Sequence, residues 1–291
     1  MKHKDKIEQY HLHKAHPERL QFEIYDLASY LKRNVEHASV AHSHSFYQIL
    51  WFYNAGGNHY VDFDVHHIKK DTVLFISKNQ IHYFDESAKH EGVIIHFNEQ
   101  FLMQSDVDIF LKYNVFNTQG RPCYCITEDI SVLANSYIEL IKTELKNNAH
   151  FGHKQVVRYL LKSLLIVFER VHRENKDGTI KFTNHYELQY LQFRELIETH
   201  YKNHNTVSEY ADLLYISSKT LSTVTKLIAS KSPSELISER LILEAQRLLS
   251  FTTLKINEVA YTLGFDDASY FVKYFKRHLK QSPSDYRKLI S

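Results

Sequence analysis

The stretch Ile256–Lys276 reads INEVAYTLGFDDASYFVKYFK and contains two helical patterns separated by a glycine. Apolar residues recur at helical spacing from Ile256 to Leu263, and Gly264 then ends the first helix because glycine tolerates positive φ. Asp267 is suited to be the N-cap of a second helix. Its inner side is expected to carry Tyr270, Phe271, Tyr274 and Phe275. A short helix, a turn and a second helix form the helix-turn-helix pattern.

A second copy of this pattern lies upstream at Val207–Lys226. Each copy leads into a Ser-Pro-Ser-acid segment, at residues 232–235 and 282–285, which is a strong helix start. Between the copies, apolar spacing predicts one linking helix from Ser234 to about Ser250. The upstream copy also has suitable cap residues: Thr206 with Glu209, and Ser217. The chain therefore carries two helix-turn-helix units, at 207–227 and 256–277, joined by one helix.

Basic residues cluster on the second unit, although the chain as a whole has a formal net charge of only +2. From Phe182 onward there are 14 Lys and Arg against 12 Asp and Glu. From Lys273 onward, the sequence has one acidic residue, Asp285, and six basic residues: Lys273, Lys276, Arg277, Lys280, Arg287 and Lys288. We therefore expect phosphate contacts to concentrate on the second unit.

Residues from about 190 to 291 resemble the DNA-binding domain of AraC/XylS-type bacterial transcription regulators. The resemblance rests on this set of matching residues: Arg240-Leu241, Glu244-Ala245, Leu248-Leu249, Ile256, Glu258-Val259-Ala260, Leu263-Gly264-Phe265, Ser269-Tyr270-Phe271, Phe275-Lys276, Ser282-Pro283 and Tyr286-Arg287. Departures are local. Ser230 and Lys280 replace the usual glycine before Ser-Pro, Thr225 replaces a phenylalanine, and Thr223 stands where a longer side chain is frequent.

The resemblance implies that the second helix of each unit reads bases in the major groove. Base-facing positions carried over from the family are Lys219, Ser222 and Thr223 in the first unit, and Ser269, Val272 and Lys273 in the second. Residues that would hold phosphates and set the register are Lys226, Lys276 and Arg277. Apolar residues expected in the core are Leu213, Leu221, Ala260, Phe265, Phe271 and Phe275.

The N-terminal half has the pattern of many short strands, which favours a small barrel. The predicted strands are Phe46–Tyr53, His59–Phe63, Thr72–Ile76, Ile81–Phe84 and Gly92–Phe97. The resemblance implies a cupin-like barrel that senses a small molecule. The expected fold class is thus α+β, with a cupin-like barrel and flanking helices before an all-α domain.

Two amphipathic helices, about Asp129–Asn148 and His153–Arg173, follow the barrel. They either cover one side of the barrel or, as the family suggests, pair with their mates in a homodimer, and both roles are compatible. A helix from about Tyr186 to His200 opens the DNA-binding domain. The expected domains are a flexible arm at 1–20, a sensor and dimerisation domain at 21–173 (barrel about 22–127, helices about 129–173), a linker at 174–184 and the DNA-binding domain at 185–291.

Histidines of the predicted barrel have the spacing of a ligand site. His42 and His44 alternate along a strand and therefore face the same way. With Gln48 and His82 they resemble the ligand set of metal-binding cupins, but Gln48 stands where a carboxylate would complete the site. Three interpretations stay open: a metal site, a hydrogen-bonded ligand pocket and structural histidines. The expected effector pocket contains His42, His44, Phe46, Gln48, Trp51 and His82, with no metal or cofactor assigned.

The predicted function is sequence-specific regulation of transcription in response to a small-molecule effector. The expected partners are double-stranded promoter DNA, the effector, a second copy of the chain and RNA polymerase. The alternative is a metal-dependent cupin enzyme fused to a DNA-binding domain. No catalytic residues are predicted, because no phosphate-binding loop, nucleophile elbow or Cys/His nucleophile pair is present in the sequence. No apolar run is long enough to span a membrane and no signal peptide is recognisable, so a cytoplasmic location is expected.

Overall fold

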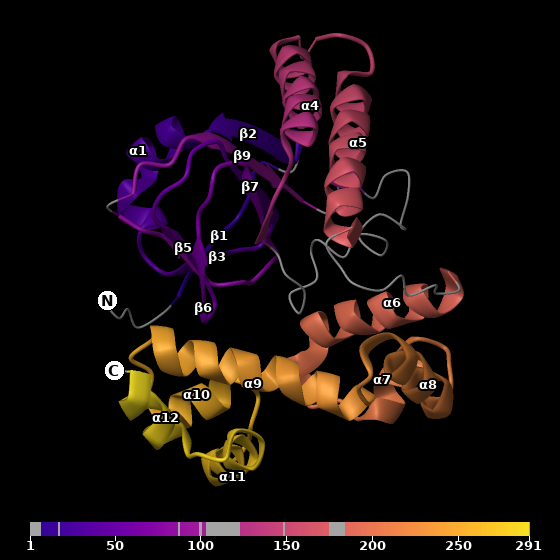
Figure 1. The fold of residues 1–291 in the computed structure, drawn as a ribbon. Helices are drawn as coiled ribbons and strands as arrows, with labels where there is room; N and C mark the ends of the chain where they lie inside the picture. The colour runs from indigo at the N-terminus through magenta and orange to yellow at the C-terminus, as the bar shows by residue number, and fades with distance from the viewer. Residues whose placement is uncertain are drawn as a thin grey trace. The chain divides into compact units, whose positions relative to one another are not determined.

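The computed structural model describes residues 7–16, 18–86, 88–98, 101–102, 123–147, 149–174 and 184–290. The chain divides into two compact units, which are considered one at a time (Figure 1). The N-terminal unit comprises residues 8–179, and the C-terminal unit comprises residues 180–291 together with the first seven residues. Among the described helices, none combines the length and the apolar character that a bilayer crossing requires.

Two five-stranded sheets form the N-terminal unit. The first sheet has the order β1 (Glu8–Tyr10), β3 (His42–His44), β8 (His82–Phe84), β5 (Asn58–Val61) and β6 (Asp64–His67). The second has the order β10 (Cys123–Cys125), β7 (Thr72–Ile76), β4 (Tyr47–Phe52), β9 (Gly92–Phe97) and β2 (Phe22–Asp26). Only the β1–β3 pair is parallel among these described strand pairs. The structure thus shows a β domain of two sheets. The closed, cupin-like barrel expected from the sequence is a more specific statement and stays a prediction.

Alternate residues of β4 divide the apolar core into two layers, because neighbouring side chains on a strand face opposite sides. Leu50 and Phe52 belong to a cluster that both sheets share. Ile49 and Trp51 belong to the cluster on the other face of the second sheet. That face is covered by α4 (Glu128–Lys146) and α5 (His153–Glu174), which lie side by side in Figure 1.

The structure corrects the N-terminal prediction at two places. The five predicted strand runs are confirmed to within two residues at each end, but residues Leu27–Ala38 form α1, a helix that the strand pattern did not anticipate. Asp26 caps this helix by accepting a hydrogen bond from the Ser29 amide at 2.8 Å. Within the expected flexible arm, Glu8–Tyr10 form β1 and pair with β3. Residues 175–183 of the predicted linker lie outside the described residues.

The C-terminal unit is helical and contains both predicted helix-turn-helix units. Its elements are α6 (Asn184–His200), the 3-10 helix η2 (Tyr201–Asn203), α7 (Val207–Leu213), α8 (Ser218–Ala229), α9 (Pro233–Phe251), α10 (Ile256–Thr262), α11 (Ala268–Leu279) and α12 (Pro283–Ile290). The predicted caps are confirmed. Thr206, Ser217, Ser232, Asp267 and Ser282 each accept a hydrogen bond from a backbone amide two or three residues later.

A buried ion-pair network fixes the linking helix α9 against the start of the unit. Arg240 Nε donates to Glu198 Oε2 at 2.7 Å, and its Nη1 donates to Glu244 Oε2 at 2.9 Å. Glu244 also accepts from Arg247 at 3.2 Å, and the Arg240 guanidinium lies 4.1 Å from the centre of the Tyr201 ring. Burial alone would raise the pKa of Glu244, but Arg240 and Arg247 hold it below its ordinary value.

A close backbone contact fixes the turn between α10 and α11. Gly264 has a φ of +85°, and a Cβ at this position would overlap the carbonyl oxygen of Lys202 in η2. The glycine therefore ends α10, as predicted, and also allows the turn to pack directly on η2.

The buried network predicts a large loss of stability on neutralising Glu244. Glu244→Gln should lower the free energy of unfolding by about 3 kcal/mol, because it leaves two buried guanidinium groups without their shared carboxylate. The exposed Lys231–Glu239 pair, at 2.7 Å, supplies the control. Glu239→Gln should cost at most about 1 kcal/mol. Urea unfolding followed by circular dichroism measures both, and equal losses would contradict the account.

The Gly264 contact predicts a second stability difference. Gly264→Ala should cost about 1–2 kcal/mol for positive φ, and about 1–3 kcal/mol more for the overlap with Lys202. Gly152 also has a positive φ, +74°, but nothing lies within 4 Å of its added Cβ. Gly152→Ala should therefore show only the first cost. A similar melting temperature for the two variants would show that the close approach to η2 is not a constraint.

Candidate nucleic-acid interface and histidine cluster

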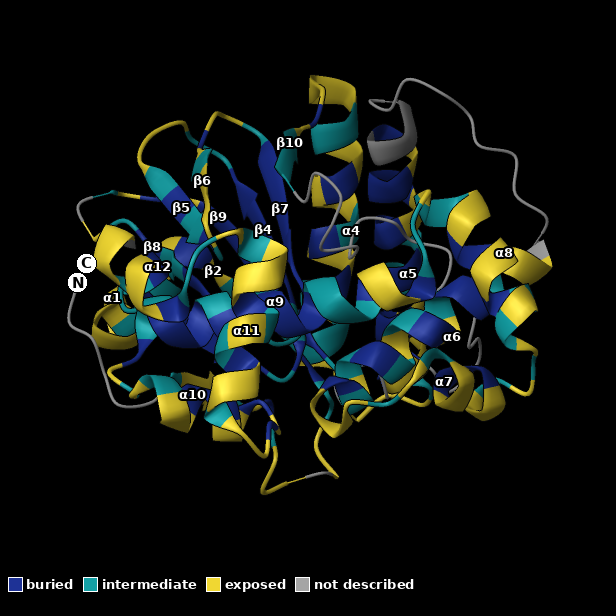
Figure 2. Cartoon of the chain, turned by 90° about the horizontal axis from the view of Figure 1, so that it is seen from below, coloured by how far each residue is buried: buried dark blue, intermediate teal, exposed yellow. Residues whose placement is uncertain are grey.

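The outer face of α11 presents most of the residues predicted to contact DNA from the second unit. Phe271 and Phe275 are fully buried and anchor the helix, while Ser269, Lys273 and Lys276 are exposed. Figure 2 shows α11 with a broad exposed surface. Val272, predicted to face a base, is only half-exposed and packs against the core. The structure thus brings Ser269 and Lys273 to one solvent-facing surface and leaves Val272 at its edge.

The C-terminal end of α11 concentrates positive charge. Its last turn carries Lys276, Arg277 and His278, which the negative end of the helix dipole favours. The Arg277 guanidinium also lies 5.2 Å from the centre of the Tyr274 ring, a contact that holds its stem on the helix surface. Lys276 and Arg277 are both exposed, as a phosphate-binding role requires.

The outer face of α8 is more polar and less charged than that of α11. Lys219, Ser222, Thr223 and Lys226 are exposed, while Leu221 and Val224 are fully buried. The Ser222 hydroxyl donates to Ser218 O at 2.8 Å, and the Thr223 hydroxyl donates to Lys219 O at 3.0 Å. Because both hydroxyl protons are engaged, these groups offer outward lone pairs, which suit the amino groups of adenine or cytosine.

Three sequence-based assignments in this unit are wrong. Tyr270 was placed on the inner side of α11 but is 55% exposed, and Leu213 was placed in the core but is 46% exposed. Arg287 was counted in the basic cluster. It is partly buried, and its guanidinium donates to the carbonyl oxygens of Leu249 at 3.1 Å and Leu254 at 2.6 Å. Arg287 therefore ties α12 to the end of α9 instead of facing solvent.

Two apolar residues on the outer surface of these helices were not anticipated from the sequence. Leu227 on α8 is 57% exposed, and Tyr270 lies on the same side of α11 as Lys273 and Arg277. The spacing i, i+3, i+7 of Tyr270, Lys273 and Arg277 was a usable signal, because such residues share one face of a helix.

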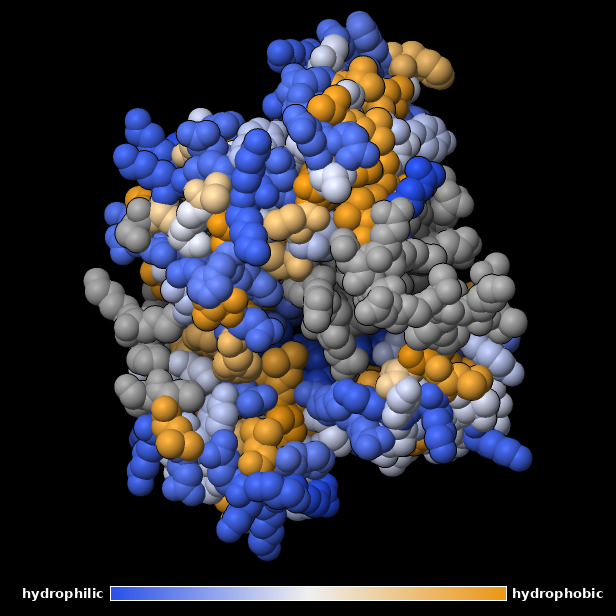
Figure 3. All heavy atoms as spheres, viewed as in Figure 1, coloured by the Kyte–Doolittle hydropathy of each residue, from blue (hydrophilic) through white to orange (hydrophobic). Residues whose placement is uncertain are grey.

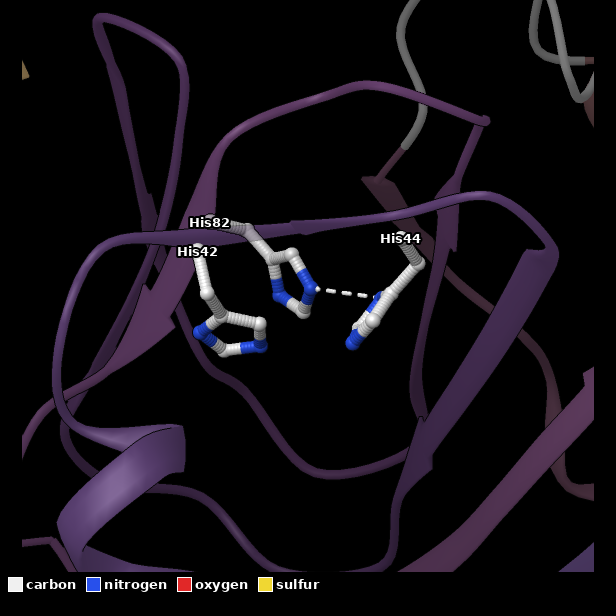
Figure 4. A group of neighbouring side chains, drawn as sticks. All are labelled: His42, His44 and His82. Atoms are coloured by element: carbon white, nitrogen blue, oxygen red, sulfur yellow. Dashed lines mark hydrogen bonds between the residues drawn. The ribbon is translucent and has the colours of Figure 1, made fainter. Parts of the chain in front are cut away.

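In the N-terminal unit, the side chains of His42, His44 and His82 point toward one another (Figure 4). His42 and His44 come from β3, and His82 comes from the neighbouring strand β8, where it is the register partner of His42. His82 Nε2 lies 3.1 Å from His44 Nδ1. The three side chains are between 1% and 6% exposed, so the sequence prediction that these histidines face inward together is matched by their positions.

Further buried groups surround this histidine cluster, which we define as His42, His44 and His82. His42 Nδ1 lies 2.7 Å from Val40 O, and His82 Nδ1 lies 3.2 Å from His59 Nε2. Burial lowers the pKa of His42 to about 4, and burial also holds the pKa of His44 and of His82 well below the ordinary value. The three imidazoles are therefore neutral at pH 7.

The other residues of the predicted effector pocket divide between the two faces of β4. Phe46 stacks on His44 with ring centres 4.4 Å apart, and Gln48 Oε1 accepts a hydrogen bond from His96 Nε2 at 3.0 Å. Trp51 does not join them. It lies in the core layer against α4 and α5, on the opposite face of the strand. The sequence could have revealed this, because alternate residues of a strand face opposite sides of the sheet. Trp51 must therefore face away from the side that Gln48 and Leu50 share.

Comparison with known proteins finds the strongest likeness in the C-terminal unit. A family model described as "Helix-turn-helix domain" matches residues 210–289, which include both α8 and α11. The uncharacterized HTH-type transcriptional regulator YisR of Bacillus subtilis (strain 168) is 32% identical over 95 residues, which cover 33% of this chain and 33% of YisR. The chain thus matches about a third of the length of that relative.

A longer and weaker match extends over both units. The HTH-type transcriptional activator RhaS of Yersinia pestis (strain Pestoides F) is 22% identical over 251 residues, which cover 84% of this chain and 88% of RhaS. Among solved structures, the C-terminal domain of AraT, a response regulator from Geobacillus stearothermophilus, is 29% identical. The match covers 35% of this chain and 84% of the AraT chain, with a TM-score of 0.33.

Proposed function

We propose that this chain, whose C-terminal unit is a helix-turn-helix domain of the AraC/XylS type, regulates transcription by binding specific promoter sequences. The observation that carries the proposal is the pair of exposed helices α8 and α11, here called the reading helices, joined by a single rigid helix. No residue of either unit is assigned a catalytic role.

The linking helix α9 sets the separation of the two reading helices. It has 19 residues, which at 1.5 Å per residue correspond to about 28 Å. This length is comparable with one turn of B-DNA, about 34 Å, so two reading helices at its ends suit successive major-groove segments on one face of the duplex. The burial of Arg240 and Leu241 along α9 keeps the separation constant.

The exposed residues of the reading helices divide into base-reading and phosphate-binding roles. Lys273 at the centre of α11 reaches guanine O6 and N7, and Ser269 contacts a neighbouring base. In α8 the corresponding roles fall to Lys219, Ser222 and Thr223. Val272 contributes an apolar edge beside them. Lys226, Lys276 and Arg277 bind phosphates and set the register.

These roles predict different effects for two lysines one turn apart on α11. Lys273→Ala should relax the preference at one base position, at a cost of about 1–3 kcal/mol for the preferred sequence. Lys276→Ala, the matched control, should weaken all sequences alike and reduce the salt slope by about one ion. Binding of both variants to a panel of single-base operator mutants, at several salt concentrations, measures this. Uniform loss in both variants would show that the roles are misassigned.

The N-terminal unit is proposed to be a cupin-like effector-sensing domain, with its two sheets forming the barrel. Its candidate pocket comprises His42, His44, Phe46, Gln48 and His82, and Trp51 is left out because it packs in the core layer against α4 and α5. In this account the effector changes how the unit holds the reading domain, and RNA polymerase is the partner that responds. These parts of the proposal are supported by the family resemblance and by the 22% identity with RhaS over most of the chain.

A homodimer formed through α4 and α5 is also proposed. Figure 3 shows apolar side chains gathering over these two helices. Exposed apolar residues there are Val132, Leu133, Leu140, Val156, Tyr159 and Ile166, with exposed fractions between 39% and 65%. An apolar surface of this kind is typical of an oligomer interface.

The proposed dimer predicts that one charge on α4 separates the subunits. Leu140 is 54% exposed, so Leu140→Glu should leave the fold intact while weakening association at least tenfold, since it buries an unpaired carboxylate in the interface. Asn135→Glu, at an exposed position elsewhere on α4, is the control. Analytical ultracentrifugation measures both. A dimer of unchanged affinity in Leu140→Glu would place the interface on another surface.

A further inference from the structure

The histidine cluster lies outside the residues assigned to DNA contact, and its geometry supports a function of its own. We propose that His42, His44 and His82 together bind one divalent transition-metal ion of the class that prefers imidazole ligands, which includes Zn²⁺, Co²⁺ and Ni²⁺. Within the described residues, these three side chains form a group whose ligand atoms all lie within 4.8 Å of one another. Figure 4 shows the rings converging from two adjacent strands.

One nitrogen–nitrogen distance in the cluster is close to that between two ligands of a coordinated ion. Zn–N bonds of about 2.0–2.1 Å place the nitrogen atoms of a tetrahedral site about 3.4 Å apart. His82 Nε2 and His44 Nδ1 are already separated by only 3.1 Å, joined by a hydrogen bond whose proton must move to His44 Nε2 when the ion binds. His42 offers a ligand atom within 4.8 Å of those of the other two, so an ion that draws it inward completes a three-histidine site, with water as the fourth ligand.

Two of the three imidazoles have the supporting contacts that metal ligands usually have. His42 Nδ1 must carry its proton, because its partner at 2.7 Å is the carbonyl oxygen of Val40. Its Nε2 is therefore the nitrogen with a free lone pair. His82 Nδ1 is held by His59 Nε2 at 3.2 Å, which leaves His82 Nε2 to face His44. Such second contacts orient ligating histidines and set their tautomers.

The surroundings also favour neutral, ligating imidazoles. Phe46 stacks on His44, and Tyr10 of β1 lies against His42 with ring centres 5.4 Å apart. This aromatic shell limits access of water, and burial lowers the pKa of all three histidines. No proton must therefore leave an imidazolium before the ion binds at pH 7.

Gln48, the weak member of the ligand set expected from the sequence, is not required. Its Oε1, the only atom of the amide that could ligate a metal ion, accepts a hydrogen bond from His96 at 3.0 Å and is therefore engaged outside the cluster. The ligand set is then three imidazoles, a combination known from zinc sites that keep one open position. A water molecule or a small anionic ligand would take the open position.

The inference deepens the proposed function in one respect, since it names the ligand class of the unit proposed to sense an effector. Metal binding itself needs neither DNA nor a regulatory response. The metal-binding proposal and the proposed regulatory function can therefore be contradicted separately, provided that DNA binding is measured on the same preparations.

The test is titration of the chelator-treated full chain with Co²⁺, followed by visible absorption, and with Zn²⁺, followed by calorimetry. We expect one ion per chain at micromolar or lower Kd, and at least tenfold weaker binding by His82→Gln. His90, a buried histidine of the same unit that contacts Phe52 and Phe84, supplies the control. His90→Gln should bind the ion as the unsubstituted chain does.

A second variant distinguishes loss of metal binding from loss of folding. His44→Cys should add a near-ultraviolet thiolate-to-Co²⁺ charge-transfer band, which places residue 44 in the coordination sphere even if affinity changes. Absence of stoichiometric binding by the folded chain would overturn the proposal, as would equal affinity in His82→Gln and His90→Gln. The latter result would assign the ion to surface histidines. Loss of DNA binding by every form would contradict the proposed function and leave the metal result standing.

Discussion

The buried guanidinium of Arg240 is the interaction on which the arrangement of the two helix-turn-helix units depends. It joins Glu198 of α6, Tyr201 of η2 and Glu244 of α9 through contacts of 2.7, 4.1 and 2.9 Å. A charge buried to this extent is tolerated only where its partners are held in place, so the network imposes one orientation of α9. The helix α8 precedes α9 in the chain, α10 follows it, and both pack against α9. The direction of α9 therefore also determines the separation of the two reading helices.

Backbone geometry at the turns is the second constraint, and the two units satisfy it differently. Gly264 takes positive φ in the second unit, whereas Tyr215 takes it in the first, with φ of +55°. The helix ends before the two Ser-Pro segments also adopt positive φ, at Ser230 and Lys280. The AraC/XylS-type pattern that the sequence resembles usually has glycine at these positions. The fold therefore retains the left-handed conformation even where the residue type disfavours it, which shows that packing determines these turns.

The C-terminal unit could be predicted almost element by element, because its signals are local. Caps at Thr206, Ser217 and Asp267, glycine at 264 and apolar spacing each act within one or two helical turns. The exceptions, Tyr270, Leu213 and Arg287, concern whether a side chain faces solvent or packs inward. In the N-terminal unit α1 was missed because its apolar residues, such as Leu27 and Leu31, lie among strand-like runs. Strand pairing is non-local, so the approach of β8 to β3, which forms the histidine cluster, could not be derived from spacing alone.

The central claim is that two reading helices bind two segments of one duplex. The most direct test is selection of bound sequences from a random DNA pool by the purified chain at near-physiological salt. The account predicts two short enriched motifs whose centres lie about one helical turn, or roughly 10 base pairs, apart. Absence of any enrichment, by both the full chain and its Phe182–Ser291 fragment, would contradict it.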